Sequence, residues 1–170
     1  MTNDELLDLV DDDDNVIGTQ WRHDVHANDK HHFRVINVFV VNDDRKIWVP
    51  RRTATKRLFP NGLDMSVGGH VGAGEGHLET FRRETMEEIG VDIDTVPWRD
   101  IGTANPINDG VNAFMHVYEI RMNDVPNYNP DDFSEFFWLT PYELLEKIAN
   151  DQFPAKGDLP ILVRKFYGRP

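Results

Sequence analysis

Residues 68–91 read GGHVGAGEGHLETFRRETMEEIGV, a glycine-rich segment that runs directly into an acidic one. From His77 to Ile89, apolar side chains recur at intervals of three and four residues. This period predicts a helix with one buried face. A glycine at position 90 is typical of the residue that ends a helix. The residues expected on the buried face are Leu78, Phe81, Thr85 and Ile89.

Three acids of this segment, Glu84, Glu87 and Glu88, fall on a face next to the apolar one, because successive residues turn by roughly 100° around a helix. Carboxylates at this spacing repel one another, and more strongly near a core of low dielectric. A hard divalent cation such as Mg²⁺ or Mn²⁺ reverses that repulsion. An acidic face can also be a simple solvated surface. The glycines, together with Glu75 and Arg83 at fixed offsets, favour a metal site.

The segment resembles the Nudix box, the pattern G-x5-E-x7-R-E-U-x-E-E-x-G-U in which U is a bulky apolar residue. Residues 69–91 match every fixed position, and Thr85 at the first U position is the one departure. We expect Thr85 to keep a methyl group in the core at a small packing cost. The resemblance implies the Nudix α/β/α sandwich with a mixed β-sheet, which we classify as α/β (α+β). It also implies hydrolysis of a nucleoside diphosphate linked to another moiety.

By the same resemblance, Glu84, Glu87 and Glu88 would bind Mg²⁺ or Mn²⁺ together with the carbonyl group of Gly69. Glu84 has a second possible role as the base that deprotonates the attacking water. Arg83 would orient the acids through an ion pair. The resemblance therefore makes this one segment both the metal site and the catalytic site.

Glu135 is a second candidate for the general base, three residues before Trp138. Nudix enzymes differ in where this base comes from, so the resemblance does not decide between Glu84 and Glu135. An ordinary surface acid on a strand at 133–139 is the other interpretation of Glu135.

Cationic side chains at 51–57 are a local exception in a chain of net charge -12. Arginine binds a diphosphate through paired hydrogen bonds. A charged edge strand and loop is the alternative explanation, but beside the box we favour contact with substrate. The residues expected to bind substrate are Arg34, Arg51, Arg52, Lys56 and His70.

Composition limits the partners and the compartment. A net charge of -12 argues against a nucleic acid polymer, whose backbone is bound by cations. The absence of cysteine excludes disulfides and thiolate chemistry. The first 14 residues, MTNDELLDLVDDDD, contain no basic segment or long apolar run. We expect a cytoplasmic protein that acts on a small-molecule diphosphate without a membrane, and a homodimer is left open.

Alternating strands and helices predict an α/β or α+β sandwich in one domain at 1–170. Its N-terminal part, 1–30, is expected to be a hairpin followed by a His-rich loop, and the box occupies 69–91. The pattern predicts the hairpin strands at 6–10 and 16–19, and further strands at 34–41, 47–52, 65–67, 101–104, 111–121 and 133–139. Helices are expected at 77–89, after the capping Thr140 and after Asp158.

Outside the box, the chain resembles the branch of Nudix proteins similar to isopentenyl diphosphate isomerase. The segments that carry this resemblance are 11–18, 49–52 with Lys56, and 63–75. An isomerase is thus an alternative function. However, the isomerase places its essential cysteine where this chain has Gly68, and its glutamate pair before Tyr118 is also missing. We therefore favour hydrolysis.

Two further questions stay open at this point. The histidines could hold a second metal through His26 and His70, or they could be polar loop residues with His70 lining the substrate pocket. The chain could also be a non-catalytic nucleotide-binding module, although the intact acids argue against this. Substrate identity is not predicted, and three aromatic residues fit either a pocket or the core: Trp48, Phe59 and Trp98. The histidines ahead of the strand at 34–41 are His23, His26, His31 and His32.

Overall fold

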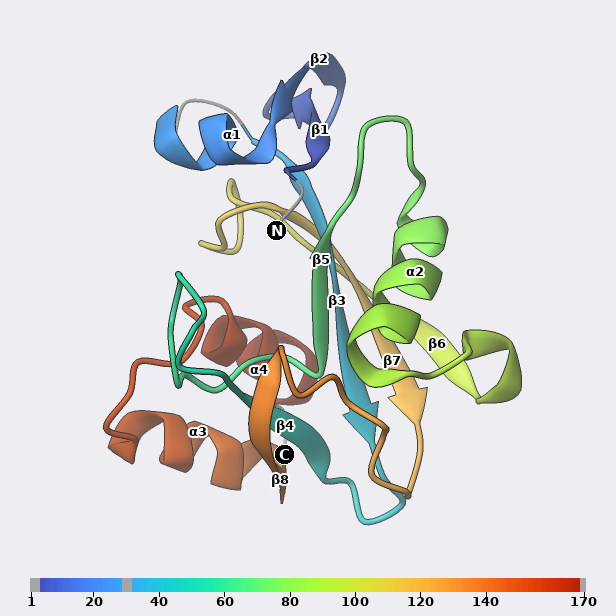
Figure 1. Cartoon of the computed structure of the whole chain (residues 1–170), viewed down its shortest axis with the longest axis vertical. Coiled ribbons are helices and arrows are strands. Elements are labelled where there is room, and N and C mark those ends of the chain that lie inside the picture. Colours follow the sequence, from blue (N-terminus) through green and yellow to red (C-terminus); the bar gives the residue numbers. More distant parts are fainter. Residues whose placement is uncertain (1–3, 29–31, 169–170) are drawn as a thin grey trace.

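A computed structural model describes residues 4–28 and 32–168 and places a β-sheet between helices (Figure 1). The first two strands form a separate hairpin, and the remaining strands form the main sheet. His31 lies outside the described residues. The elements are β1 (Leu6–Val10), β2 (Val16–Trp21), α1 (Arg22–Asn28), β3 (Arg34–Val41), β4 (Ile47–Arg52), β5 (Val67–His70), α2 (His77–Ile89), a 3-10 turn (Ile93–Thr95), β6 (Trp98–Ala104), β7 (Phe114–Arg121), β8 (Phe133–Leu139), α3 (Pro141–Asn150) and α4 (Leu159–Tyr167).

Strand β3 lies at the centre of the main sheet. It pairs with β7 in parallel and with β5 antiparallel, and the strand order is β6-β7-β3-β4-β8 with β5 beside β3. The antiparallel register sets Gly69 of β5 opposite Ile36 of β3. The first glycine of the box is thus held against the most central strand. The mixed sheet expected from the resemblance is confirmed.

Both faces of β3 are buried, because its side chains alternate between two apolar cores. Phe39 and Val41 contact the core that contains Leu162 of α4. The other core joins the alternate side chains of β3 to Phe81 and Ile89 of α2. The strand predicted at 34–41 is confirmed. The alternate side chains are Ile36, Val38 and Val40.

Local sequence signals explain the ends of two helices. Gly90 after α2 has a φ of 64°, a left-handed conformation that favours glycine, and its N–H donates to the carbonyl of Met86. At the start of α3, the Thr140 hydroxyl accepts from the N–H of Glu143, whose carboxylate accepts from the N–H of Thr140. This reciprocal cap confirms the helix start predicted after Thr140.

Two expectations about helices are wrong. Residues Arg22–Asn28 form α1 where a His-rich loop is predicted, and its Val25 packs into a core. Leu78 is 47% exposed instead of buried. The buried face of α2 is rotated away from Leu78, because Thr80 and the carboxylate-bearing Glu84 occupy positions that face the interior.

Four strands also differ from the predictions in their bounds, and the first of them, β2, ends at Trp21 instead of at 19. The strand predicted at 65–67 lies at Val67–His70, so it includes the first glycines of the box. Strand β6 begins earlier than predicted, at Trp98, and β7 begins later, at Phe114. Boundaries of this kind depend on pairing with neighbouring strands, which local sequence does not reveal.

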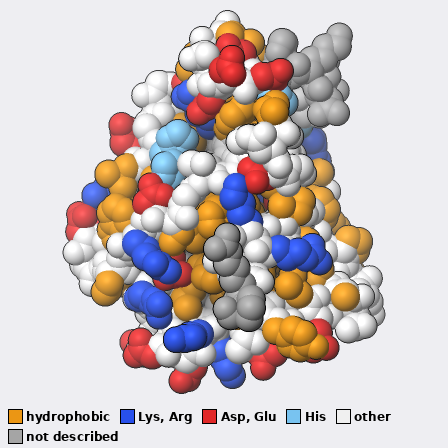
Figure 2. All heavy atoms as spheres, turned by 180° about the vertical axis from the view of Figure 1, so that it is seen from behind, with side chains coloured by type: hydrophobic (Ala, Val, Ile, Leu, Met, Phe, Trp, Pro, Cys, Tyr) orange, Lys and Arg blue, Asp and Glu red, His pale blue; other side chains and the backbone are white. Residues whose placement is uncertain are grey.

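The hairpin end of the molecule carries a concentration of acidic side chains (Figure 2), where the turn at 11–14 joins β1 to β2. In the described part of the chain, no helix combines the length and apolar character needed to cross a membrane.

Candidate functional site

A cavity of about 690 Å³ lies between the N-terminal segment, the acidic face of α2 and the loops that follow β4 and precede α4. This volume falls within the range of roughly 300–1,000 Å³ that is typical of small-molecule sites. Carboxylates and cations line it together. The acids of the box that line the cavity are Glu84, Glu87 and Glu88, and the cations are Arg22, Arg52, Lys56 and Lys156.

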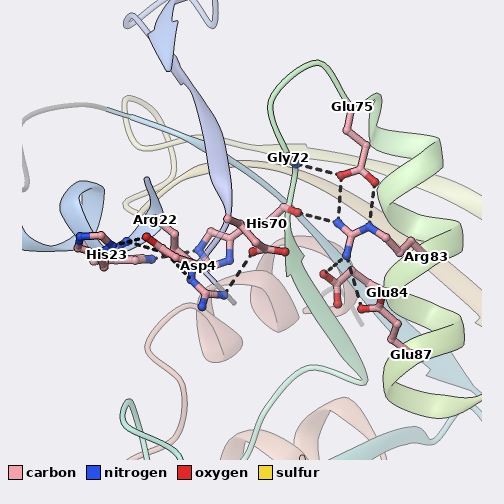
Figure 3. A network of polar contacts seen from close by, with 11 residues as sticks. Asp4, Arg22, His23, His70, Gly72, Glu75, Arg83, Glu84 and Glu87 are labelled. Carbon is pink, nitrogen blue, oxygen red and sulfur yellow. Dashed lines mark hydrogen bonds and ion pairs between the residues drawn. The ribbon is translucent and has the colours of Figure 1, made fainter. Parts of the chain in front are cut away.

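Arg83 holds the acidic part of the box together (Figure 3). Its Nε and Nη2 donate to the two oxygens of Glu75 over 2.9 and 3.0 Å. Its Nη1 donates to Oε1 of Glu84 over 2.8 Å and, over a longer 3.5 Å, to Glu87. Nη2 also donates to the carbonyl of His70 at 3.3 Å. One guanidinium therefore ties the loop before α2 to the acids on the helix.

Glu75 supports the site by binding Arg83. Burial raises the pKa of its carboxyl group, but hydrogen bonds from Arg83 and from the N–H of Gly72 outweigh burial, so the net pKa is lowered. The carboxylate stays charged and folds the glycine loop back onto the arginine. It does not line the cavity.

Gly69 and Glu84 are in direct contact, which explains the first glycine of the box. A Cβ atom added at Gly69 would lie 2.3 Å from Cδ of Glu84 and 2.5 Å from its Oε1. No side chain fits at that distance without moving the carboxylate. The backbone of β5 at Gly69 can therefore approach the carboxylate of Glu84 closely.

Two acids of α2, the buried Glu84 and the half-buried Glu88, carry an unfavourable charge without a cation. Burial raises the pKa of Glu84 to about 7, although Arg83 opposes the shift. Burial also raises the pKa of Glu88 well above its ordinary value, and the charges of Glu84 and Asp64 add to that effect. Among the described residues, Glu88 has no hydrogen-bond or ion-pair partner through its carboxylate. Buried, mutually repelling oxygen donors of this kind fit a hard divalent cation.

In residues 4–28 and 32–168, no three histidine or acidic side chains already converge as a metal-binding group. Arg83 lies among Glu75, Glu84 and Glu87 instead (Figure 3). The predicted metal ligands therefore lie on one helix and one adjacent strand without already converging on a common point.

Two of the predicted substrate-binding cations line the cavity, and each is paired with an acid. Arg52 Nη1 donates to Asp64 over 2.6 Å, and Lys56 Nζ donates to Asp132 over 2.6 Å. His70, also predicted to bind substrate, lines the same cavity. Its Nε2 lies 3.0 Å from Nε2 of His26. Burial lowers the pKa of His70 to about 3, so its ring is neutral at neutral pH.

Three other predicted residues lie outside this lining. Arg34 pairs with Asp14 in the hairpin turn at 2.7 Å. Arg51 and Glu135 pair with each other at 2.6 Å across β4 and β8, and both line a separate surface depression. The structure thus separates Glu135 from the acids of the box.

Sequence reasoning missed several residues that line the cavity. Lys156 comes from the segment before α4, and its Nζ lies 3.7 Å from Oδ1 of Asp64. The same ammonium group would lie 3.3 Å from a Cβ atom at Gly68, the position where the isomerase carries cysteine. Arg22 reaches the cavity from α1 and pairs with Glu5 at 3.3 Å. Only the fold brings these segments to the box, so no local pattern could have indicated them.

A protein-family model described as the NUDIX domain matches residues 30–157. The chain belongs to the Nudix family. It is 47% identical over 163 residues to an uncharacterized Nudix hydrolase of Nostoc sp., with 96% of each chain covered. It is also 46% identical over 165 residues to a Nudix hydrolase of Deinococcus radiodurans, with 97% of this chain and 95% of the relative covered. The identification from the box is confirmed, and the chain is a Nudix hydrolase.

Solved Nudix structures are similar in fold. The crystal structure of DR0079 from Deinococcus radiodurans has a TM-score of 0.90 and 45% identity, and the match covers 96% of this chain and 99% of that chain. The Nudix domain of Shewanella oneidensis NrtR, solved with ADP ribose, has a TM-score of 0.57 and 16% identity over 85% of this chain and 95% of that chain. The second likeness supports the fold alone. As a Nudix hydrolase, the protein acts on the general class of nucleoside diphosphate-linked substrates, and such enzymes generally use divalent metals.

Proposed function

We propose that this Nudix hydrolase uses Mg²⁺ or Mn²⁺ to cleave a phosphoric anhydride bond in a nucleoside diphosphate derivative. The metal ligands of the proposal are Glu84, Glu87, Glu88 and the carbonyl of Gly69. One observation carries it: these residues line the same cavity of about 690 Å³ as Arg52 and three other cations. Acids for a metal and cations for phosphate thus line one space large enough for a small molecule.

The metal, when bound, would neutralise charge on the phosphoryl oxygens and lower the pKa of a bound water. Glu84 is our choice for the residue that accepts the proton of the attacking water. Arg83 engages Oε1 of Glu84 and so fixes the direction of the carboxylate. Glu135 has no place in this role, because its carboxylate pairs with Arg51 outside the cavity.

Substrate phosphates would be bound by Arg52, Lys56 and Lys156. Each cation already lies within 4 Å of an acid, 2.6 Å for Arg52 and Lys56 and 3.7 Å for Lys156. These acids hold the cations in place before substrate arrives, which limits the ordering that binding requires. An anionic diphosphate then forms charge-assisted hydrogen bonds with cations that are already oriented.

The test is a product screen with the purified protein and Mn²⁺ or Mg²⁺ against nucleotides, nucleotide sugars and dinucleotides, with mass identification of the products. We expect metal-dependent release of phosphate-containing products. Glu88→Gln should lower the rate by orders of magnitude, whereas the matched acid-to-amide control Glu135→Gln should not. Equal rates in wild type and Glu88→Gln, or a complete absence of products, would contradict the proposal.

A further inference from the structure

The loop that follows β4 has an uncommon backbone conformation at two neighbouring positions. Phe59 has a φ of 50° and Asn61 a φ of 61°, and neither residue is glycine. Asparagine tolerates the left-handed region, but a bulky aromatic residue rarely adopts it. Such a conformation persists only where the surroundings hold it, and it is found often where proteins grip ligands.

Two arginines hold this loop by its carbonyl groups. Arg52 Nε donates to the carbonyl of Leu58 over 3.0 Å, and Arg51 Nη1 donates to the carbonyl of Asn61 over 2.8 Å. The two bonded carbonyls lie on either side of Phe59. Because both guanidinium groups are also paired with acids, the loop is anchored to strand β4 on both sides of the aromatic residue.

The anchored loop presents apolar side chains to the cavity. Leu58 is 50% exposed and Phe59 is 37% exposed, and both line the cavity that contains the acids of α2. The tip of the Phe59 ring would lie 3.9 Å from a Cβ atom at Gly157, so this glycine lies beside the ring. Covering exposed apolar surface in a cavity with a ligand makes binding more favourable.

A polar group lies next to this apolar surface. Asp158, which follows Gly157, lines the same cavity and is only 7% exposed. Its side chain stands at the N-terminus of α4 but makes no capping hydrogen bond to that helix. Its carboxyl group accepts a hydrogen bond from the backbone N–H of Asn112, and its remaining lone pairs can accept further hydrogen bonds from a ligand.

We propose that Leu58, Phe59, Gly157 and Asp158 form the subsite for the nucleobase of the substrate, with the base stacked on the Phe59 ring and its polar edge at Asp158. The inference rests on the proposed function, because it takes a nucleoside diphosphate as the ligand. A flat heterocycle matches both features of this subsite. An alkyl chain would cover the apolar side chains but offer no hydrogen bond to Asp158 while excluding water from it, so it fits less well.

The test measures binding without turnover. Dissociation constants of methylenediphosphonate, which lacks a base, and of a set of nucleoside α,β-methylene diphosphates are determined by calorimetry with the Mn²⁺-loaded full chain. We expect wild type to bind at least one nucleoside probe about 10-fold or more tightly than methylenediphosphonate, a size consistent with one base stacked on an aromatic ring. Phe59→Ala should remove most of this preference and leave methylenediphosphonate binding unchanged. Phe59→Trp should retain the preference.

Asp158→Asn provides an independent readout, because it exchanges an acceptor for a donor at nearly constant shape. It should change the order of preference among the bases. The lost negative charge near Lys156 should strengthen the binding of all diphosphonate probes alike, methylenediphosphonate included, so the order of preference is the readout. If Phe59→Ala does not fold, as judged by circular dichroism, Phe59→Leu takes its place and the same comparison decides.

Three outcomes would overturn the subsite: no advantage of any nucleoside probe over methylenediphosphonate in wild type, an unchanged advantage in Phe59→Ala, or tighter binding of a geranyl methylenediphosphonate than of every nucleoside probe. Failure of the proposed function looks different. In that case methylenediphosphonate itself would not bind in a Mn²⁺-dependent way.

Discussion

Replacing Thr85 with valine should stabilise the protein, although this position lies within the most informative motif of the chain. Thr85 is fully buried on α2, and its hydroxyl oxygen has no hydrogen-bond partner within residues 4–28 and 32–168. An unpaired buried polar group costs about 1–3 kcal/mol. Valine has nearly the same shape and a similar helix propensity, so it removes this cost and adds an apolar contact. We expect the free energy of unfolding to rise by about 1 kcal/mol.

Thr80 supplies the matched control on the same helix. It is equally buried, but its hydroxyl donates to the carbonyl of Gly76 over 3.2 Å. Thr80→Val breaks this bond, and we expect it to lower the free energy of unfolding by about 1 kcal/mol. Denaturation in urea at neutral pH measures both variants, and for a chain of this length 1 kcal/mol corresponds to a change of about 2–4 °C in the melting temperature. If Thr85→Val were no more stable than wild type, the hydroxyl must have a partner and the reasoning fails.

Three further predictions concern the site. Gly69→Ala should abolish activity without loss of secondary structure by circular dichroism, because the added Cβ would lie 2.3 Å from Cδ of Glu84. Mn²⁺ should raise the melting temperature of wild type but not of Glu88→Gln, since binding to the folded state alone stabilises it. Without metal, Glu88→Gln should melt above wild type, because burial and nearby negative charge already disfavour the Glu88 carboxylate. His70 should make stability depend on pH. Burial lowers its folded pKa to about 3 from 6.5, so the unfolded chain binds the proton first as the pH falls below 6.5. The free energy of unfolding should therefore fall by up to about 2 kcal/mol between pH 7 and pH 5, and His70→Asn should reduce this fall in urea titrations at the two pH values.

Short-range patterns predicted much of the fold. The bounds of α2 follow from its apolar period and the glycine at 90, and the start of α3 follows from the cap at Thr140. Both signals act within a few residues, so the sequence contains all the information they need. The exposure of Leu78 could not be predicted from such short-range patterns. Its exposure depends on how α2 is rotated against the sheet, and that rotation is set by packing rather than by the period alone.

The cations at 51–56 show that candidate residues close in sequence do not all belong to one site. Arg51, Arg52 and Lys56 are neighbours in sequence, but their side chains contact different acids, and Arg51 does not line the cavity. The register of β4 against β8 shifts between Arg51 and Arg52, and the two side chains separate at this irregularity. Composition predicts that a cluster of charge exists, but only the register of the strand decides which member lines the cavity.

Lys156 also shows that proximity in sequence does not decide which cations line the cavity. It is 100 positions or so beyond the arginines in sequence, yet its ammonium group shares Asp64 with Arg52. Two cations on one carboxylate leave a net positive charge at this side of the cavity, which an isolated ion pair would not. The acids of the box contribute negative charge to the same cavity. If the proposed function is correct, Lys156→Gln should therefore raise KM for a diphosphate substrate about 10-fold or more with a smaller effect on kcat, because the lysine attracts the phosphates but does not take part in proton transfer. An equal KM in wild type and variant would show that Lys156 does not attract the phosphates and that they bind elsewhere.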